Sequence, residues 1–328
     1  MLRRKTKAKF SNGTLTIKSE DIERVVAAQP ENISNARGYF KQVKLKNSTH
    51  IASAELKREY GNIPVIVRGD TGVTPKHGAD VTDIVPMPIE IDDKISAVDI
   101  DELGRATDLG TNQIVDSYLE QHADMVRNTV NALCCQAHKG SIDYMMKSGS
   151  GFERYQVNYG TVKNVSFTGK ISQLTLGLAV QNLSAIKQLT VDQGVGGPGE
   201  FVACAAFYAK MIDLLAAANK TESVKDGWLQ IGPYKVLEDN DSYVDTAKNG
   251  TKTTKGICGA REVVYRALNA GQKLCYLRLD DVVQKAAVPI YSFTEKESGQ
   301  RGMKLYTKSK PFPLVNVKGL AYGTFAAE

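Results

Sequence analysis

The stretch that decides the fold is TNQIVDSYLEQHADMVRNTVNALCCQAHK, residues 111–139. Seven of its positions recur at intervals of 4, 3, 4, 4, 3 and 4 residues and form one continuous stripe on a helix: Val115, Leu119, His122, Val126, Val130, Leu133 and Ala137. Thr111 or Asn112 can cap the first turn, and Gly140 can end the helix. At about 1.5 Å per residue, the segment predicts a rod of roughly 40 Å that serves as a spine.

The segment before this helix is typical of a projecting, β-rich loop. A run that alternates imperfectly, 40–46, and a β-rich run, 63–67, are followed by the turn-forming sequence Gly69-Asp70-Thr71-Gly72. A third, alternating run at 85–91 contains two prolines, which confine it to an edge strand or an extended connection. Because a loop of this length is unusual in a compact domain, we expect residues 41–92 to pack on a neighbouring molecule.

Residues 1–40 and the part after the long helix complete an α+β pattern. The first 40 residues contain one short amphipathic helix candidate, 19–28, and otherwise indicate an extended arm. Residues 141–172 indicate strands and turns, and residues 240–255 a polar loop. Helices are expected at 173–190 and 206–218, and strands at 155–160, 201–204, 234–238, 273–279, 282–293, 304–308 and 311–325.

The net charge of +6 is unevenly distributed along the chain. Residues 1–60 carry 13 Lys and Arg against 6 Asp and Glu, whereas residues 69–108 carry 3 against 10. These segments of +7 and −7 are either two solvated faces or a contact in which the basic arm lies on the acidic segment of another subunit, or of its own. Nucleic-acid contact is a third interpretation. It would use Arg3, Arg4, Lys5, Lys7 and Lys9, although no aromatic residue stands among them before Phe10.

Size and composition exclude several classes of protein. The chain has 328 residues, 42% of them hydrophobic, which is enough for a sizeable core. No apolar run approaches the roughly 20 residues that cross a bilayer, and no apolar segment follows the basic start. We therefore expect no membrane contact and a protein that starts in a cytoplasm. The five cysteines lack CxxC spacing, which predicts reduced, buried thiols: Cys134, Cys135, Cys204, Cys258 and Cys275.

A search for catalytic, cofactor and metal sites finds none in the required context. Gly194, Gly196 and Gly199 match GxGxxG, but the motif follows a helix and precedes a strand, so it indicates a turn and not a phosphate cradle. The Asp239–Asp241 carboxylates also indicate a turn, because the rest of a calcium loop is missing.

The four histidines stand in no metal-ligand spacing. His122 is expected to be a packed histidine on the apolar stripe, and His138 near the helix end is expected to serve the helix dipole or solvent. Together these patterns predict no enzyme, no cofactor and no metal.

Four stretches in order carry a family resemblance. The segment 63–91 leads through Ile95-Ser96-Ala97-Val98-Asp99-Ile100 into the long helix, and the strand Val157-Asn158-Tyr159-Gly160 follows it. Then come GPYKVLEDNDSYVD at 232–245 and KSKPFPLVN at 308–316. Over roughly residues 60–328 the chain resembles the lambda-type (family E) major capsid proteins of tailed bacteriophages, which share the Hong Kong 97-type capsid fold. Asn158 stands where the family usually has an acidic residue.

The resemblance implies a Hong Kong 97-type fold of four parts. Residues 1–40 would be the N-terminal arm, and residues 41–92 the extended loop, or E-loop, that overlaps a neighbouring subunit. The peripheral (P) domain would hold residues 93–172 and 281–310, with the spine helix at 111–139. The axial (A) domain would hold residues 173–280 and 311–328.

The resemblance also implies a function. The protein would be a structural major capsid protein that self-assembles into pentamers and hexamers of an icosahedral phage head enclosing double-stranded DNA. It would be assembled in the host cytoplasm and reside in the virion. A scaffold protein, a decoration protein and a portal would be its partners; a separate scaffold is expected because the chain shows no long N-terminal helix that could replace one.

Three other functions stay open on the sequence alone. A same-fold, encapsulin-like nanocompartment shell would require a cargo enzyme, a nucleic-acid-binding protein would use the basic arm, and an enzyme would need an unrecognised site. For a shell, the candidates for contact between subunits are basic, apolar and acidic side chains that the chain does not need for its own core. They are Arg3, Arg4, Lys5, Ile63, Val65, Val67, Val85, Asp80, Asp83, Asp92 and Asp93.

Overall fold

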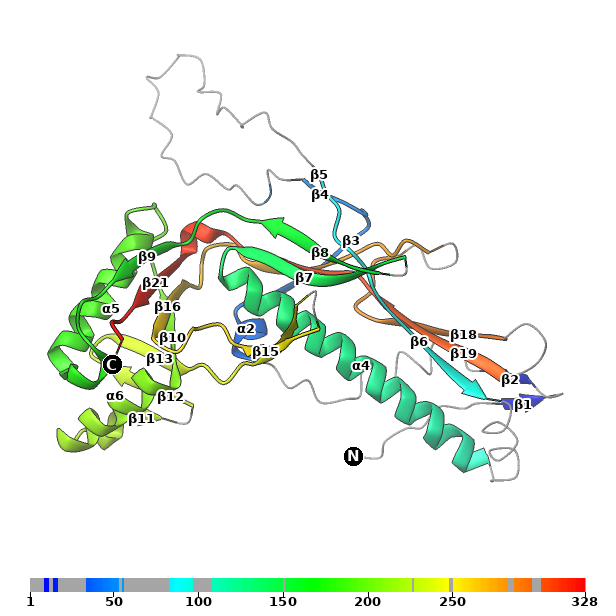
Figure 1. The fold of residues 1–328 in the computed structure, drawn as a ribbon, viewed down its shortest axis with the longest axis horizontal. Coiled ribbons are helices and arrows are strands. Elements are labelled where there is room, and N and C mark those ends of the chain that lie inside the picture. The colour runs from blue at the N-terminus through cyan, green and yellow to red at the C-terminus, as the bar shows by residue number, and fades with distance from the viewer. Residues whose placement is uncertain are drawn as a thin grey trace, which may run out of the picture.

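The computed structural model describes residues 9–11, 14–16, 34–52, 55, 83–96, 108–149, 151–225, 227–247, 250–281, 286–296 and 302–327. A long helix runs beside small sheets and ends near a larger sheet that two shorter helices cover (Figure 1). The helix expected at 19–28 and the strand expected at 63–67 lie outside the described residues. Within the described part, no helix combines the length and the apolar character that a membrane crossing requires.

The long helix expected at 111–139 is confirmed as α4, Asp108–His138. Its stripe faces the interior from Leu119 onward, and every residue from Ala132 to His138 is buried. A helix that is buried on all sides is surrounded by the rest of the protein. The end of α4 is therefore part of the core, whereas its middle has one exposed side.

The larger sheet has seven strands in the order β11-β12-β13-β10-β16-β21-β9. Helices α5 (Leu176–Val191) and α6 (Ala205–Ala217) pack on it, close to the two helices that the sequence predicts. The strands are β9 (Lys163–Ser166), β10 (Gly199–Ala203), β11 (Val224–Lys225), β12 (Trp228–Ile231), β13 (Tyr234–Glu238), β16 (Glu262–Ala267) and β21 (Leu320–Thr324).

This sheet is a wall shared by two hydrophobic cores. Successive residues of a strand point to opposite faces. Phe201 and Tyr265 accordingly belong to the core under α5 and α6, whereas Val202 and Val264 belong to the core around α4. All four residues are at most 1% exposed. The central strands thus read as continuous apolar runs because both of their faces are covered.

The core around α4 also takes in a three-stranded sheet of order β20-β17-β3. These strands are Pro311–Leu314, Lys273–Leu277 and Gln42–Lys46. Strands β17 and β20, which the sequence assigns to the axial part, therefore pack with α4 and not under α5 and α6. This happens because β17 forms hydrogen-bonded pairs with β20 on one side and with β3 on the other.

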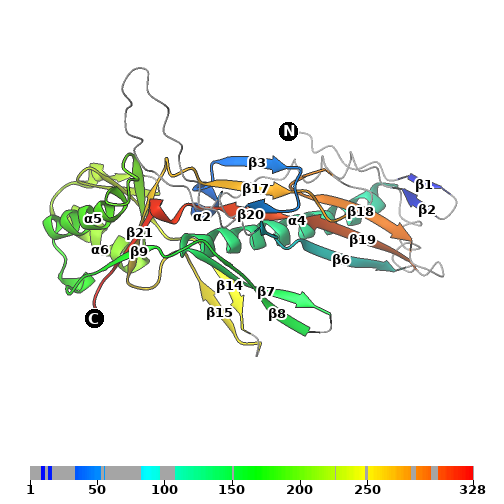
Figure 2. The same ribbon diagram turned by 90° about the horizontal axis from the view of Figure 1, so that it is seen from above.

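A second three-stranded sheet, of order β18-β19-β6, lies along the outer half of α4 (Figure 2). Its strands are Tyr291–Lys296, Gly302–Ser309 and Ile89–Ser96. The run expected as a strand from residue 85 becomes one only at Ile89, beyond its two prolines. Short pairs complete the described part: β1 (Lys9–Ser11) with β2 (Thr14–Thr16), and β4 (Ile51–Ala52) with β5 (Asp83–Ile84).

Two hairpins project together from the body (Figure 2). One is β7 (Ser141–Ser148) with β8 (Gly151–Asn158), and the other is β14 (Tyr243–Thr246) with β15 (Lys252–Lys255). The second corrects the expectation of a polar loop at 240–255. Its strands are mostly exposed and polar, so they carry no apolar alternation that a sequence could show.

Candidate intersubunit surface

The acidic strand β6 divides its side chains between two environments. Ile95 is buried and Asp93 reaches α4, whereas Glu90, Asp92 and Lys94 are exposed on the other face of the sheet. Two aspartates that are adjacent in sequence thus have opposite surroundings, because a strand alternates its faces. The inner face of the sheet packs on α4, and the outer face carries the exposed charges.

On the inner face, a fully buried histidine joins α4 to all three strands. His122 Nε2 lies 2.9 Å from Asp93 Oδ2, and Nδ1 lies 2.8 Å from Thr307 Oγ1. Thr307 Oγ1 lies 2.8 Å from Ser292 Oγ. When Nε2 donates to Asp93, Nδ1 accepts from Thr307, which accepts in turn from Ser292, and every polar group is satisfied. The expected packed histidine is confirmed, and its partners are new.

The outer face of this sheet combines stacked rings with charges. Register places nine side chains there in three rows. They are Tyr291, Lys308 and Glu90; Phe293, Tyr306 and Asp92; and Glu295, Lys304 and Lys94. The Phe293 ring stacks on Tyr291 at 5.5 Å and on Tyr306 at 5.1 Å. Half-buried rings beside exposed carboxylates are suited to a protein contact, because aromatic residues are enriched there.

The charges of this face are only partly neutralised within the subunit. Lys308 Nζ lies 2.8 Å from Asp281 and 3.8 Å from Glu90, and the hydrogen bond to Asp281 raises the pKa of Lys308. Within the described part of the chain, Asp92 has no cationic partner at ion-pair distance. The face therefore presents a carboxylate that its own fold does not use.

Only a few of the candidates for contact between subunits lie among the residues that the structure describes. Val85 is 42% exposed just before β6, and Asp83 lies in the short strand β5. Asp93 has a partner in its own subunit, so its role between copies stays a prediction. The remaining candidates lie outside the described residues: Arg3, Arg4, Lys5, Ile63, Val65, Val67 and Asp80.

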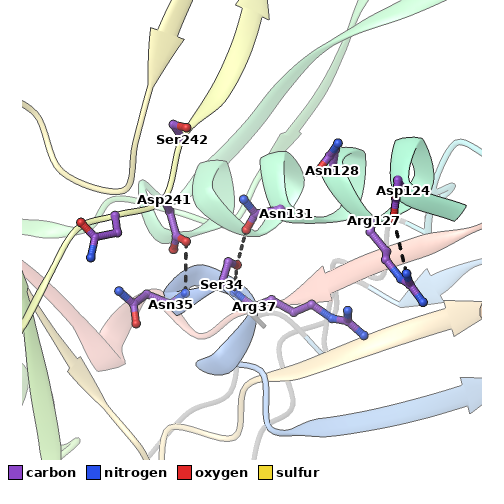
Figure 3. A pocket seen from close by; sticks show the side chains of 10 residues that line it. Ser34, Asn35, Arg37, Asp124, Arg127, Asn128, Asn131, Asp241 and Ser242 are labelled. Atoms are coloured by element: carbon purple, nitrogen blue, oxygen red, sulfur yellow. Dashed lines mark hydrogen bonds and ion pairs between the residues drawn. The ribbon is translucent and has the colours of Figure 1, made fainter. Parts of the chain in front are cut away.

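A joint between α4 and the seven-stranded sheet has no signal in the sequence. Helix α2 (Asn35–Gly38) sits beside α4 and the connection between β13 and β14, at the edge of a polar pocket of about 420 Å³ (Figure 3). Ser34 caps α2 by accepting from the Arg37 N–H at 3.1 Å, and it also contacts Asn131 of α4. Asp241 accepts from the N–H groups of Asn35 and Ala36. The expected turn at 239–241 thus holds a segment that is about 200 residues away in sequence.

The same joint contains a buried ion pair. Arg266, 2% exposed, binds Glu200 through Nε at 3.0 Å and Nη2 at 2.7 Å, and its Nη1 donates to the Asn35 carbonyl at 2.6 Å. The guanidinium also lies 5.4 Å from the centre of the Tyr39 ring. Residues 34–40, which the sequence assigns to the arm, are therefore fixed in the body, and Ala36, Tyr39 and Phe40 are buried.

His138 departs from its expected role at a helix end. It is fully buried between the rings of Tyr39 and Phe40, at centroid distances of 5.0 and 5.7 Å, and its Nδ1 donates to the Cys134 carbonyl at 2.8 Å. Burial lowers the pKa of His138 to about 3. The physical reason is the segment that follows α2, because the rings of Tyr39 and Phe40 cover the end of α4 and exclude water from it.

An ion network fixes the two projecting hairpins to one another. Arg154 of β8 binds Asp143 of β7 at 2.7 Å and Asp245 of β14 at 3.3 Å, and Lys255 binds Asp245 at 2.6 Å. The hydrogen bond from Arg154 lowers the pKa of Asp143. The hairpins are thus a single projection, with Phe152 63% exposed near the tip of one and Val244 54% exposed on the other.

No metal centre is evident where the structure describes the chain: no group of three or more His, Cys, Asp and Glu side chains there is arranged to hold an ion. The five cysteines form no disulfide, and four of them are buried. Burial raises the pKa of the Cys134 thiol, and the Sγ of Cys258 donates to the Val202 carbonyl at 3.3 Å. A thiol with a raised pKa is a poor nucleophile.

Comparison with known families gives one match. Residues 28–324 match the sequence model of the family described as phage major capsid protein E. No curated protein sequence matches the chain.

One solved structure shares its fold, and others are similar to a lesser degree. A prophage protein of Escherichia coli CFT073, described as a capsid protein, has a TM-score of 0.61 and 14% identity, over 94% of this chain and 99% of that chain. The mature capsid of bacteriophage PhiM1 has a TM-score of 0.47 and 10% identity, over 92% and 90%. An encapsulin complex of Synechococcus elongatus PCC 7942 has a TM-score of 0.46 and 9% identity, over 90% of this chain and 89% of that chain. At these identities the likeness concerns the fold alone, and only the first carries weight.

Proposed function

Because the chain belongs to the phage major capsid protein E family, we propose that the outer face of its β18-β19-β6 sheet joins copies of it into pentamers and hexamers. The protein is a shell-forming structural protein. The proposed shell is an icosahedral phage head that encloses double-stranded DNA. Such a shell requires each subunit to present surfaces that its own fold leaves unused.

The main support for this proposal is that β6 places its neighbouring aspartates in two different environments. Asp93 satisfies His122 inside the subunit, whereas Asp92 is exposed beside the Phe293 and Tyr306 rings and has no cationic partner among the described residues. The chain also carries a complementary basic segment, residues 1–60, with a net charge of +7. Opposite charges of this kind set the register of a contact more than its affinity. The basic arm of one subunit is thus proposed to lie on the acidic strand of another.

The parts of the subunit follow the Hong Kong 97-type scheme in this proposal. Helix α4 is the spine of a peripheral domain together with the β18-β19-β6 sheet, and the seven-stranded sheet with α5 and α6 is the axial domain. Of the residues 41–92 that the resemblance assigns to the extended loop, 47–88 are proposed as that loop, because Gln42–Lys46 pairs with β17 and Ile89–Ser96 pairs with β19. The residues before 34 are the arm. Many weak contacts of such parts make a closed shell strong through multivalency.

Partners are proposed from the family resemblance. A scaffold protein would guide assembly in the host cytoplasm, and a portal and a decoration protein would join the shell in the virion. The DNA would lie inside the shell. Co-purification of shells with the products of neighbouring genes, followed by mass spectrometry, identifies these partners.

A charge reversal tests the proposed surface. In Asp92→Lys the acidic face becomes repulsive to a basic arm, so the yield of shells should fall at least about tenfold, as for a contact weakened by about 1.4 kcal/mol. The subunit itself should keep its thermal stability, because Asp92 is exposed. Glu153→Lys, a reversal at an exposed carboxylate of strand β8 and outside this sheet, is the matched control.

Salt provides a second test of the same contact. Added salt screens exposed charges, with a Debye length of about 10 Å at 0.1 M and about 3 Å at 1 M. Light scattering should therefore show weaker assembly at high salt than at low salt. Assembly that is independent of salt would contradict the electrostatic contact, although not the shell itself.

A further inference from the structure

Strand β3 is exposed on both faces and along one edge. Val43 is 52% exposed and Leu45 is 59% exposed, although both are large apolar residues. Strand β17 pairs with β3 in parallel on one side. On the other side, no strand of the described part of the chain accompanies it (Figure 2).

The backbone of β3 shows which residues face the open edge. The Arg278 N–H donates to the Lys46 carbonyl at 3.0 Å, so Lys46 points its backbone groups toward β17. In a strand these groups alternate from side to side with each residue. Val43 and Leu45 consequently present their N–H and C=O groups to the open edge, together with their exposed side chains.

An open edge with apolar side chains is a site for an added strand. Lysines on such an edge also occur as a guard against unwanted pairing, and β3 carries Lys44 and Lys46. Lys46 pairs with Glu55, whereas Lys44 has no acidic partner among the described residues. Two copies of β3 would repel one another if paired, because Lys44 and Lys46 would face lysines. A suitable partner therefore alternates apolar and acidic residues.

The chain contains such alternation at Ile89–Asp92 and at Val98–Asp101. The first run is already in β6, where it pairs with β19, and Ile89 and Ile91 pack on the core around α4. The second run, Val98-Asp99-Ile100-Asp101, matches Val43-Lys44-Leu45-Lys46 residue type by residue type. Apolar residues meet on one face and opposite charges on the other whether the two strands run parallel or antiparallel.

Pairing of these two runs within one copy is disfavoured by their distance. The end of β6 and the start of α4, which flank residues 97–107, lie together at one end of the molecule, and β3 lies near its middle (Figure 1). A strand from another copy has no such restriction. A contact of this kind uses two different surfaces of the subunit and is heterologous, which is the type that closes rings.

We propose that strand β3 of one subunit takes residues 98–101 of a second copy as an added strand. Val43 and Leu45 pack on Val98 and Ile100. Lys44 pairs with Asp99 on the opposite face. The proposal rests on the proposed function, because it supplies a contact of the shell, and it is separate from the contact at Asp92.

Charge exchange between Lys44 and Asp99 tests the proposal. Lys44→Glu and Asp99→Lys should each reduce the yield of shells at least about tenfold, because each puts like charges opposite one another. The double variant should recover the yield of the wild type. In a mixture of the two single variants, copies can alternate only in rings with an even number of subunits, so sheets or tubes of hexamers should form, whereas a pentamer keeps one mismatched contact. Lys41→Glu, outside the strand, is the matched control, and subunit stability should be unchanged by Lys44→Glu.

Each other outcome overturns the pairing or locates the failure elsewhere. Single variants that assemble like the wild type would mean that Lys44 and Lys46 only prevent unwanted strand pairing at this edge. Recovery in the double variant without any association of subunits in the mixture would place the contact within one copy. A wild type that forms no shell in any condition would refute the proposed function, and sedimentation would then still show whether Lys44→Glu weakens association of the subunits.

Discussion

Strands β10 and β3 are each five residues long, and they differ in what covers them. Strand β10 pairs with β13 and β16 and is covered on both faces, one face by each core. Strand β3 has β17 alone as its partner among the described strands, and four of its five side chains are exposed. The difference is that the described part of the chain covers β10 on both faces and both edges, whereas it leaves one edge of β3 without a paired strand.

Truncation in the two strands should therefore affect different properties. Phe201→Ala in β10 removes a ring that packs on Tyr265 at 4.9 Å, and it should lower the free energy of unfolding by about 3–5 kcal/mol. Leu45→Ala in β3 should change it by less than about 0.5 kcal/mol while reducing assembly. Urea titration of unassembled subunits measures the first effect. Equal losses of stability at the two positions would contradict the comparison.

Removing Arg266 from its buried ion pair with Glu200 of β10 should lower the free energy of unfolding almost as much. Arg266→Met leaves Glu200 without its main partner, and the free energy of unfolding should fall by about 3 kcal/mol, the lower end of the range for a broken buried pair. The lower end applies because Lys235 remains 3.4 Å from Glu200. The double variant Arg266→Met, Glu200→Met should recover most of the loss. No recovery would mean that Arg266 acts through α2 and Tyr39 alone.

Acid should destabilise the subunit through His138. Its folded pKa of about 3 lies below the unfolded value of about 6.5, so between these pH values the unfolded chain binds one more proton. Stability from this group is complete above pH 6.5 and should decrease by about 1.4 kcal/mol for each unit below it. The measurement is the unfolding free energy of wild type and His138→Leu between pH 7 and about 5. Equal slopes for both proteins would contradict the assignment.

The smallest expected effects on stability come from the same substitution at two neighbouring aspartates of β6. Asp93→Asn weakens the hydrogen bond to His122 and should lower stability by about 1 kcal/mol. Asp92→Asn should leave stability within about 0.5 kcal/mol and weaken assembly. Thermal unfolding and light scattering separate the two. A reversed order would show that the faces of β6 have been exchanged.

Local periodicity allowed much of the fold to be predicted from the sequence. The period of α4 is visible over seven positions, and strand β13, Tyr234–Glu238, is found where it was expected. Contacts between distant segments have no such signal. Nothing in the sequence near Asn35 indicates that Asp241 and Arg266 hold it, because those residues are more than 200 positions away.

The candidate surface illustrates the same limit. The alternation of β6 implies that Asp92 and Asp93 face opposite sides, but only the position of His122 determines which side is inside. Likewise, the alternation in Val43-Lys44-Leu45-Lys46 predicts a strand, and its exposure follows only from the neighbours it lacks among the described strands.

The central claim is that these unused strand surfaces build a shell. Negative-stain electron microscopy of the purified protein, alone and co-expressed with the products of neighbouring genes, tests it most directly. The account predicts closed shells, sheets or tubes with pentamer and hexamer units. A small, monodisperse particle under every condition would contradict it.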